Sequence, residues 1–274
     1  MQLKQLELEG GGTLTVYLRD SCERMPKAID RPLVLVVPGG GYTHVSAREG
    51  DPVALQFAAA GYHAAVLDYA ICEQAKDGLP LRQLAQAIGL VRQHAAGWHI
   101  LPEKIAVCGF SAGGHLAASV GTLWNGKEAR GYFGENTQAL KPDGLILAYP
   151  VIISDFDGEK MIHKGSFNNL LGEENRENGE MLEYLCLDRR VSKSTPPTFI
   201  WSTFEDTGVP CDSTLRFATA LKKNGVPFEL HIYEKGTHGK ATGDLITNKE
   251  TYRLKNWLKE VCDWIEDTRS AYLD

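Results

Sequence analysis

Short apolar runs separated by turn residues recur along the chain. Five of them are uninterrupted, at residues 33–37, 64–67, 105–108, 145–148 and 199–201, and a further strand pattern lies at 228–233. Apolar runs of this length without alternating polar positions are typical of strands buried on both faces. The pattern therefore predicts a sheet whose two faces are both covered.

Helical periodicity occupies intervals between these strands. In the two clearest cases apolar residues recur at spacings of three and four positions. These sets are Leu81, Leu84, Ala85, Ile88 and Val91, and Leu254, Trp257, Leu258, Val261 and Ile265. Strands that alternate with amphipathic helices indicate an α/β fold with a mostly parallel sheet and helices on both faces.

Two regions depart from this alternation. The first two expected strands, at about 3–8 and 13–18, are separated only by Gly10-Gly11-Gly12, which predicts an antiparallel hairpin at the N-terminal edge of the sheet. The interval at about 154–195 is rich in Asn, Glu and Gly and holds only short helical pieces. Because this interval is too long for a plain connection, we expect a small cap-like insertion lying over one face of the sheet.

Composition narrows the class of protein. A chain of 274 residues fits one α/β domain spanning 1–274, with two domains as the alternative. With 43% hydrophobic residues and no apolar run near ~18 residues, a soluble globular protein is expected and no membrane span. The excess of 35 acidic over 29 basic side chains, without a Lys/Arg cluster, argues against a nucleic-acid partner.

Cysteine usage and the N-terminus bear on compartment and cofactors. The six cysteines are scattered singly, with no C-x-x-C and no histidine at metal-ligand spacing. Neither a disulfide framework nor a zinc site is therefore expected, and no metal or other cofactor. The first seven residues alternate polar and apolar types, unlike a signal peptide, which predicts a cytoplasmic protein.

The strongest chemical signal is the segment 109–114, Gly-Phe-Ser-Ala-Gly-Gly, between the strand at 105–108 and a helical pattern that begins near His115. Small residues on either side of Ser111 allow the sharp turn that exposes a nucleophilic hydroxyl in a G-x-S-x-G elbow. The alternative is a glycine-rich strand-to-helix turn that only packs closely or binds an anion at the start of the helix.

A glycine run, Gly39-Gly40-Gly41, directly follows the strand at 33–37. Alone, such a run is most simply a turn. Upstream of an elbow, however, it favours a loop whose amide N–H groups form an oxyanion hole, with the N–H of Ala112 as a further donor.

A serine nucleophile needs a base, and in enzymes with this elbow the acid and then the histidine follow the serine along the chain. Of the histidines after Ser111, His163 falls in the insertion and His231 inside the last strand. His238 lies in a glycine-flanked loop just past that strand, where its side chain can reach the elbow. His238 is therefore the predicted base.

The acid that orients the base should follow the strand at 199–201. Asp206 begins the pattern Asp-x-x-Val-Pro in this loop and is the predicted acid. Glu205 is the competing candidate, with a solvated loop charge as its simpler interpretation. Asp212 is interpreted as the N-cap of a helix that starts near Ser213.

Three further side chains lie near these segments. His115 is one helical turn past Ser111 and is interpreted as a packing or hydrogen-bonding residue. His44, beside the glycine loop, is expected to line the mouth of the pocket, and Tyr42 is expected to narrow its acyl side. Tyr42 and His44 are the predicted substrate-binding residues.

The chain resembles the α/β-hydrolase superfamily, in the acetyl esterase/lipase branch near acetyl-xylan esterases and feruloyl-esterase-like (BD-FAE type) hydrolases. The segments that carry this resemblance are 38–42, 46–50, 109–116, 195–199, 206–210 and 236–239. The resemblance implies an α/β-hydrolase fold, Ser111, His238 and Asp206 as the triad, and the amides of Gly40, Gly41 and Ala112 around the oxyanion.

Two departures from the family pattern refine this interpretation. Pro38 stands where the lipase branch usually has a histidine before the glycines, which favours the xylan-esterase-like side. Ser202 stands where relatives often carry the histidine of Trp-His-Thr, so a pocket role for that histidine is absent here.

The resulting hypothesis is a serine carboxylesterase that hydrolyses short-chain acetyl esters through an acyl-enzyme. Deacetylation of acetylated sugars or xylo-oligosaccharides rests on the resemblance alone. The alternatives are an arylformamidase or small peptidase/amidase on the same triad, and a non-catalytic binding protein on a hydrolase fold. The expected partner is a small-molecule ester; a homo-oligomer is neither predicted nor excluded.

Overall fold

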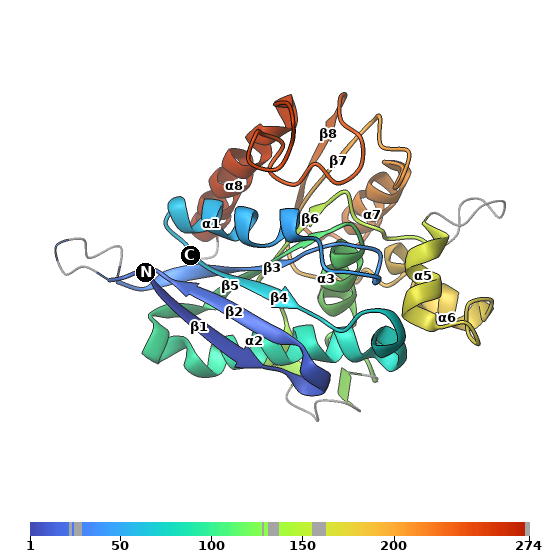
Figure 1. Cartoon of the computed structure of the whole chain (residues 1–274), viewed down its shortest axis with the longest axis horizontal. Helices are drawn as coiled ribbons and strands as arrows, with labels where there is room; N and C mark the ends of the chain where they lie inside the picture. The colour runs from blue at the N-terminus through green and yellow to red at the C-terminus, as the bar shows by residue number, and fades with distance from the viewer. Residues whose placement is uncertain (22–23, 25–28, 128, 131–136, 155–162, 272–274) are drawn as a thin grey trace.

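A central eight-stranded sheet organises the computed structural model, which describes residues 1–21, 24, 29–127, 129–130, 137–154 and 163–271 (Figure 1). The strand order is β1-β2-β4-β3-β5-β6-β7-β8. The strands are β1 (Gln2–Glu7), β2 (Thr13–Leu18), β3 (Arg31–Val37), β4 (His63–Asp68), β5 (Ile100–Phe110), β6 (Gly144–Ala148), β7 (Thr198–Thr203) and β8 (Phe228–Tyr233).

The N-terminal edge of the sheet is antiparallel and the rest is parallel. β1 pairs with β2, and β2 with β4, in antiparallel register, whereas β3 pairs in parallel with β4 and β5, and β5 through β8 pair in parallel in turn. The predicted hairpin and the predicted mostly parallel sheet are both confirmed.

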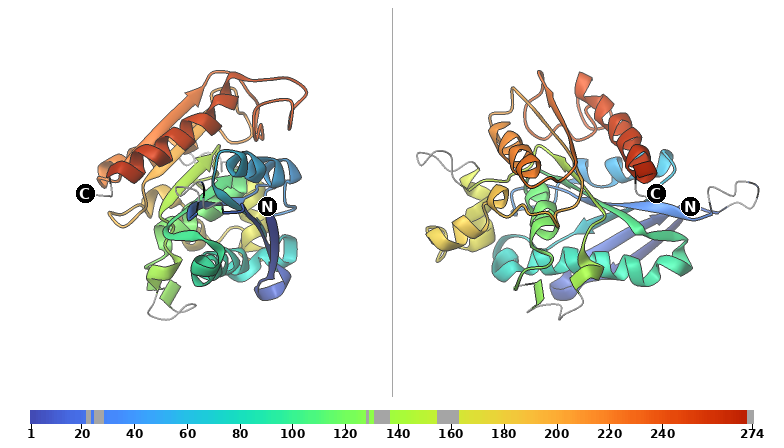
Figure 2. Two further views of the ribbon diagram at one scale, coloured as in Figure 1. Left: turned by 90° about the vertical axis from the view of Figure 1, so that its left-hand side faces the viewer. Right: turned by 180° about the vertical axis from the view of Figure 1, so that it is seen from behind.

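Helices cover both faces of the sheet (Figure 2). The helices are α1 (Asp51–Ala59), α2 (Leu79–Trp98), α3 (Ser111–Leu123), α5 (Lys164–Leu171), α6 (Gly179–Tyr184), α7 (Asp212–Lys223) and α8 (Trp257–Ala271). Leu33, Leu35 and Val37 of β3 belong to the core beneath α2, α3 and α7, whereas Val34 and Val36 belong to the core beneath α1 and α8. Because successive strand residues point to opposite faces, a strand between two helical layers must be apolar at every position, as the sequence pattern indicates.

The expected insertion at about 154–195 is described from residue 163 onward; residues 155–162 lie outside the described residues. Its helix α5 lies beside the glycine loop, where the Asn169 side-chain amide donates to the Gly41 carbonyl at 2.8 Å. Phe167 of α5 packs its buried ring against His115, and Leu187 joins the core next to α3 and α7. The described part of the insertion therefore packs against the glycine loop and α3.

The loops that contain the predicted site residues all lie at the carboxyl ends of the parallel strands. β3, β5, β6, β7 and β8 are mutually parallel, so their carboxyl ends meet at the same edge. The glycine loop, Ser111, Asp206 and His238 follow four of these ends, which is where α/β sheets place their sites. Among the described helices, none is long and apolar enough to cross a membrane.

Candidate active site

Ser111 occupies a strained turn between β5, which ends at Phe110, and α3. Its φ of 52° lies in the left-handed region, which costs on the order of 1–3 kcal/mol for a residue other than glycine. The turn is possible because its neighbours are glycines: a Cβ on Gly109 would lie 2.3 Å from the Gly113 carbonyl oxygen, and one on Gly113 would lie 2.2 Å from the Val37 oxygen. The local sequence thus forms the sharp elbow that its glycines predict.

Ser111, His238 and Asp206 form one hydrogen-bonded chain. Ser111 Oγ lies 2.7 Å from His238 Nε2, and His238 Nδ1 lies 2.7 Å from Asp206 Oδ2. The Asp206 side chain is buried, while that of His238 is one quarter exposed. The structure therefore brings together the three residues predicted as the triad, in the order in which a base activates a hydroxyl and a carboxylate orients the base.

The loop after β7 separates the two acid candidates. Asp206 Oδ1 accepts hydrogen bonds from the amides of Gly208 and Val209, both at 2.9 Å, so both of its carboxylate oxygens are engaged. Glu205 is exposed and instead accepts from Lys235 Nζ at 2.9 Å and from the Gly236 amide at 3.1 Å. The hydrogen bond from Lys235, followed by that from Gly236, holds the pKa of Glu205 below its usual range. Glu205 therefore has a partner of its own away from His238.

Other residues weighed from the sequence take structural positions. His115 is buried, with Nδ1 3.0 Å from the Tyr42 hydroxyl and Nε2 3.3 Å from the Leu185 carbonyl oxygen. His231 Nε2 lies 2.7 Å from Glu229 Oε1 on β8. The N-cap interpretation of Asp212 is wrong, because α7 begins at Asp212 itself and has Cys211 at the cap position.

The glycine loop supplies free backbone donors beside Ser111. Gly40 and Gly41 have φ values of 125° and 63°, and a Cβ on Gly40 would lie 1.9 Å from the His44 carbonyl oxygen. Within the described part of the chain, neither amide donates a hydrogen bond. The Ala112 amide lies in the first turn of α3, where an N–H has no intrahelical acceptor. By contrast, the Gly39 amide donates to Glu49.

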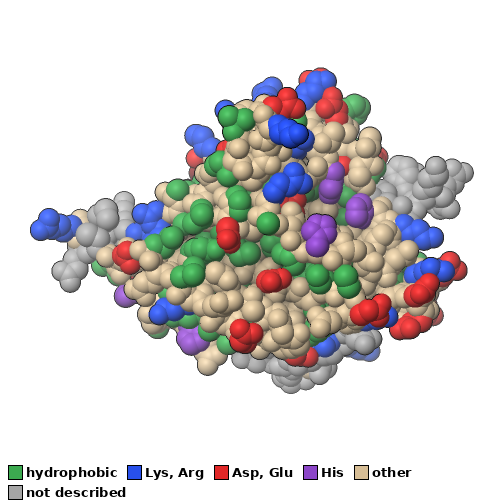
Figure 3. Space-filling view, in the orientation of Figure 1, with side chains coloured by type: hydrophobic (Ala, Val, Ile, Leu, Met, Phe, Trp, Pro, Cys, Tyr) green, Lys and Arg blue, Asp and Glu red, His purple; other side chains and the backbone are tan. Residues whose placement is uncertain are grey.

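A cavity of about 390 Å³ opens over Ser111 and His238. Figure 3 shows histidine side chains close together near the centre of this face of the molecule. The cavity is lined by Gly40, Gly41, Thr43, His44, Ser46, Arg48, Glu49, Ser111, His163, Gly165, Asn169, His238 and Gly239. Its lining is mostly polar or glycine and includes the predicted mouth residue His44.

Tyr42 does not take its expected place. Its ring is buried, its hydroxyl contacts His115, and it lines a different, mostly apolar cavity of about 450 Å³ between α3 and the insertion. Tyr42 has a left-handed backbone conformation (φ 60°), and its side chain is not part of the lining of the cavity at Ser111.

Three cavity residues, His163, Gly165 and Asn169, come from the insertion, and the two with polar side chains were not predicted as site residues. The His163 ring lies 6.1 Å from that of His238 between centroids, and its Nδ1 lies 2.8 Å from Ser166 Oγ. Burial, followed by the nearby His238, lowers the pKa of His163. Asn169 lines the same cavity. No local pattern marks either residue, because their place in the site depends on where the insertion packs.

Metal-ligating side chains are not clustered in the part of the chain that the structure describes. Across these residues, no three His, Cys, Asp or Glu side chains are grouped so as to hold a metal ion. Cys72, Cys108, Cys211 and Cys262 are free thiols, and Cys22 lies outside the described residues.

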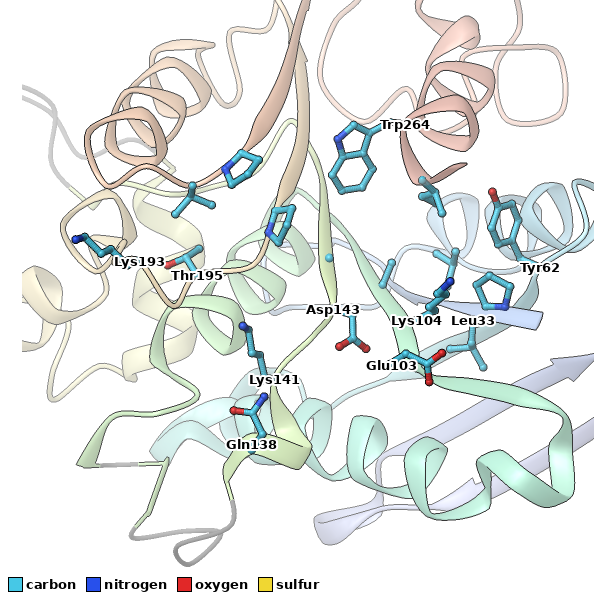
Figure 4. A pocket seen from close by; sticks show the side chains of 18 of the residues that line it. Leu33, Tyr62, Glu103, Lys104, Gln138, Lys141, Asp143, Lys193, Thr195 and Trp264 are labelled. Atoms are coloured by element: carbon cyan, nitrogen blue, oxygen red, sulfur yellow. The ribbon is translucent and has the colours of Figure 1, made fainter. Parts of the chain in front are cut away.

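A roomier cavity of about 580 Å³ lies far from the elbow (Figure 4). It is lined by residues at the amino ends of strands, such as Leu33 and Gly144, together with Asp143 and with Trp264 of α8. The carboxyl ends of the same strands carry Ser111 and its partners. The more voluminous of these two cavities is therefore not the one that contains the hydrogen-bonded Ser111, His238 and Asp206.

Comparison with known proteins gives one family and a consistent set of relatives. The BD-FAE family model matches residues 22–221. The chain is 34% identical to endo-1,4-beta-xylanase B of Butyrivibrio fibrisolvens over 77% of its length and 33% of that protein. It is 30% identical to an acetylxylan esterase of Xylanibacter ruminicola over 83% of its length and 45% of that protein. The chain thus spans between a third and a half of the length of these curated relatives.

Solved structures agree over nearly the whole chain. An acetyl ester-xyloside bifunctional hydrolase from Caldicellulosiruptor lactoaceticus superposes with a TM-score of 0.81 at 38% identity, over 95% of this chain and 89% of that one. A carboxylesterase from Lactobacillus plantarum superposes with a TM-score of 0.84 at 26% identity, over 98% of both chains. The similarity therefore extends over nearly all of the sheet and helices that position Ser111, Asp206 and His238.

Proposed function

The chain belongs to the BD-FAE family and has the α/β-hydrolase fold, and from this premise we propose that it is a serine carboxylesterase. One observation carries the proposal: the unbroken chain from Ser111 Oγ through His238 to Asp206, with both contacts at 2.7 Å. The names of the relatives, an acetylxylan esterase and a carboxylesterase among them, support the same class of reaction.

The geometry suits acyl transfer through a covalent intermediate. His238 Nε2 takes the proton as Ser111 Oγ attacks the ester carbonyl, and the N–H groups of Gly40, Gly41 and Ala112 stabilise the oxyanion. Asp206 keeps the proton on His238 Nδ1, so that Nε2 is free to accept. The imidazolium then gives its proton to the departing alcohol. A water molecule, deprotonated by His238, attacks the acyl-enzyme, releases the acid and restores the serine.

The cavity supports a short acyl group on a polar alcohol. Glycine backbone, histidine and Asn169 surround Ser111, whereas the apolar cavity lined by Tyr42 is separate from it. We therefore propose acetyl esters of sugars or xylo-oligosaccharides as substrates, in agreement with the names of the xylan-active relatives. The described residues that line this cavity include no aliphatic or aromatic hydrocarbon side chain, so a long acyl chain has no large apolar side chain among them to pack against.

The decisive experiment combines active-site labelling with a substrate series. A fluorophosphonate probe should label the protein but not its Ser111→Ala variant, and kcat/KM should fall from nitrophenyl acetate through butyrate to octanoate. Release of acetate from acetylated xylo-oligosaccharide tests the alcohol side. If the probe does not label the protein and no ester is cleaved, the remaining interpretation is a non-catalytic binding protein with this fold. Octanoate cleaved as well as acetate would refute the short acyl group, and hydrolysis of an arylformamide alone would indicate an amidase.

A further inference from the structure

Glu49 is a buried carboxylate beside the triad that takes no part in the proton transfers. It lies at the end of the 3-10 turn Ala47–Glu49 and is only 3% exposed. Within the described residues it has no ion-pair partner, so its burial must be offset by hydrogen bonds. Its Oε2 accepts from the Gly39 amide and its Oε1 from the Tyr149 hydroxyl, each at 2.8 Å. Each carboxylate oxygen thus holds a different segment of the site.

The Gly39 contact orients the start of the glycine loop. A Cβ on Gly39 would lie 2.7 Å from the Phe110 carbonyl oxygen and 2.9 Å from Ser111 Cβ, so this peptide packs directly against the elbow. Because its N–H points to Glu49, the orientation of the chain that enters Gly40 is set by this carboxylate. The oxyanion amides proposed above come next in the chain.

The Tyr149 contact reaches the loop that carries the base. Tyr149 follows β6, and its hydroxyl donates to Glu49 and accepts from the Ala241 amide at 3.0 Å. Burial, followed by the charge of Glu49, raises the pKa of Tyr149 far above its usual range, so the phenol keeps its proton. The Tyr149 ring also meets the imidazole of His238 edge-on, with centroids 5.0 Å apart. Ala241, three residues past His238, has a φ of 48° and needs such contacts to stay in place.

We propose that Glu49 and Tyr149 are positioning residues whose hydrogen bond connects the oxyanion loop to the His238 loop. This inference rests on the proposed serine esterase function. In the transition state the oxyanion donors and the imidazole must both be aligned on the atoms attached to Ser111, and a misplacement of about 1 Å can cost on the order of 10²-fold in rate. The hydrogen bond between Glu49 and Tyr149 fixes the positions of the glycine loop and the His238 loop relative to each other, on either side of Ser111.

Two isosteric variants test the connection. In Glu49→Gln, an N–H₂ group faces one of the two donors, the Gly39 amide or the Tyr149 hydroxyl. Tyr149→Phe removes the hydroxyl but keeps the ring against His238. Each should lower kcat for nitrophenyl acetate by about 10- to 100-fold and leave KM within about threefold, because alignment and not substrate binding is lost. Tyr17→Phe is the matched control, since its hydroxyl also bonds a carboxylate, Asp51, at 2.5 Å but outside the site; its kcat should match the wild type.

The double variant separates positioning from a general loss of stability. If the two residues act through one connection, Glu49→Gln/Tyr149→Phe should be at most about threefold slower than the slower single variant. Losses that multiply, or a kcat within twofold of wild type in both single variants, would overturn the proposal. Should Glu49→Gln fail to fold, Tyr149→Phe alone decides by its kcat and Tm against Tyr17→Phe. Wild-type protein that neither reacts with fluorophosphonate nor cleaves nitrophenyl acetate would refute the esterase function itself; active wild type with unaffected variants would refute only the connection.

Discussion

Replacing Asp206 by asparagine tests how the acid controls the histidine. Oδ1 of Asp206 accepts two amide hydrogen bonds, from Gly208 and Val209, while Oδ2 receives His238 Nδ1. In Asp206→Asn the carboxamide oxygen must stay with the two amides, so the new N–H₂ group faces His238. The imidazole then accepts at Nδ1 and carries its proton on Nε2, where it cannot take the proton of Ser111.

The expected loss follows from the two amide contacts. The productive arrangement requires the carboxamide of the Asp206→Asn variant to flip, which leaves the N–H donors of Gly208 and Val209 facing an N–H₂ group. Val209 is buried, so its unsatisfied donor costs about 1–3 kcal/mol, whereas the exposed Gly208 can donate to water. At about 1.4 kcal/mol per factor of ten, kcat should fall by about 5-fold to about 10²-fold. The variant keeps most hydrogen bonds of the loop, so it should still fold.

The assay is kcat and KM for nitrophenyl acetate, with Tm measured on the same preparations. Glu205→Gln is the matched control, because it makes the same chemical change on the adjacent residue, whose partners are Lys235 and Gly236. Its kcat should remain within about threefold of wild type. A larger loss in Glu205→Gln than in Asp206→Asn would refute the reasoning and assign the acid to Glu205.

Three other outcomes are expected. Ser111→Ala should lose fluorophosphonate labelling and on the order of 10⁴- to 10⁶-fold in kcat while Tm stays close to wild type; residual turnover above about 1% would point to another nucleophile. Gly40→Ala should lower kcat by about 10²-fold or more, because its Cβ would lie 1.9 Å from the His44 carbonyl oxygen. Gly41→Ala should lower kcat much less, because the nearest atom to its Cβ would be 3.6 Å away. Equal losses of kcat in the two variants would contradict the steric argument. Burial lowers the pKa of His115 to about 4 in the folded protein. As the pH falls below about 6.5, His115 is therefore protonated in the unfolded chain but not in the folded protein. The folded protein loses stability between about pH 6.5 and about pH 4. His115→Gln should therefore show a smaller drop in Tm from about pH 7.5 to about pH 5 than wild type, and an equal drop would contradict this assignment.

Local patterns were sufficient for much of the architecture and for the elbow. Strands buried on both faces need an apolar residue at every position, so the runs at 33–37 and 105–108 indicated central strands without knowledge of their neighbours. The elbow is equally local, because the left-handed φ of Ser111 is tolerated only with glycines two residues to either side. The chain order of serine, acid and histidine then restricted the partners to a few loops.

The choice between neighbouring candidates was made by tertiary contacts. Asp206 and Glu205 are adjacent and chemically alike, and only the turn of the loop gives one to His238 and the other to Lys235. The expected position of Tyr42 was wrong for the same reason, since its side chain packs against His115 and Tyr69 and not in the cavity over Ser111.

The sequence by itself therefore determined the set of elements, their alternation and the position of the proposed nucleophile, all of which depend on residues within a few positions of one another. The cavity and its supports exist only in the folded chain. His163 and Asn169 reach the site because the insertion packs on the glycine loop, and Glu49 reaches Tyr149 across 100 positions because β3, β6 and β8 end at one edge. Such contacts leave no local periodicity, since buried carboxylates and phenols are placed by the hydrogen bonds available in three dimensions.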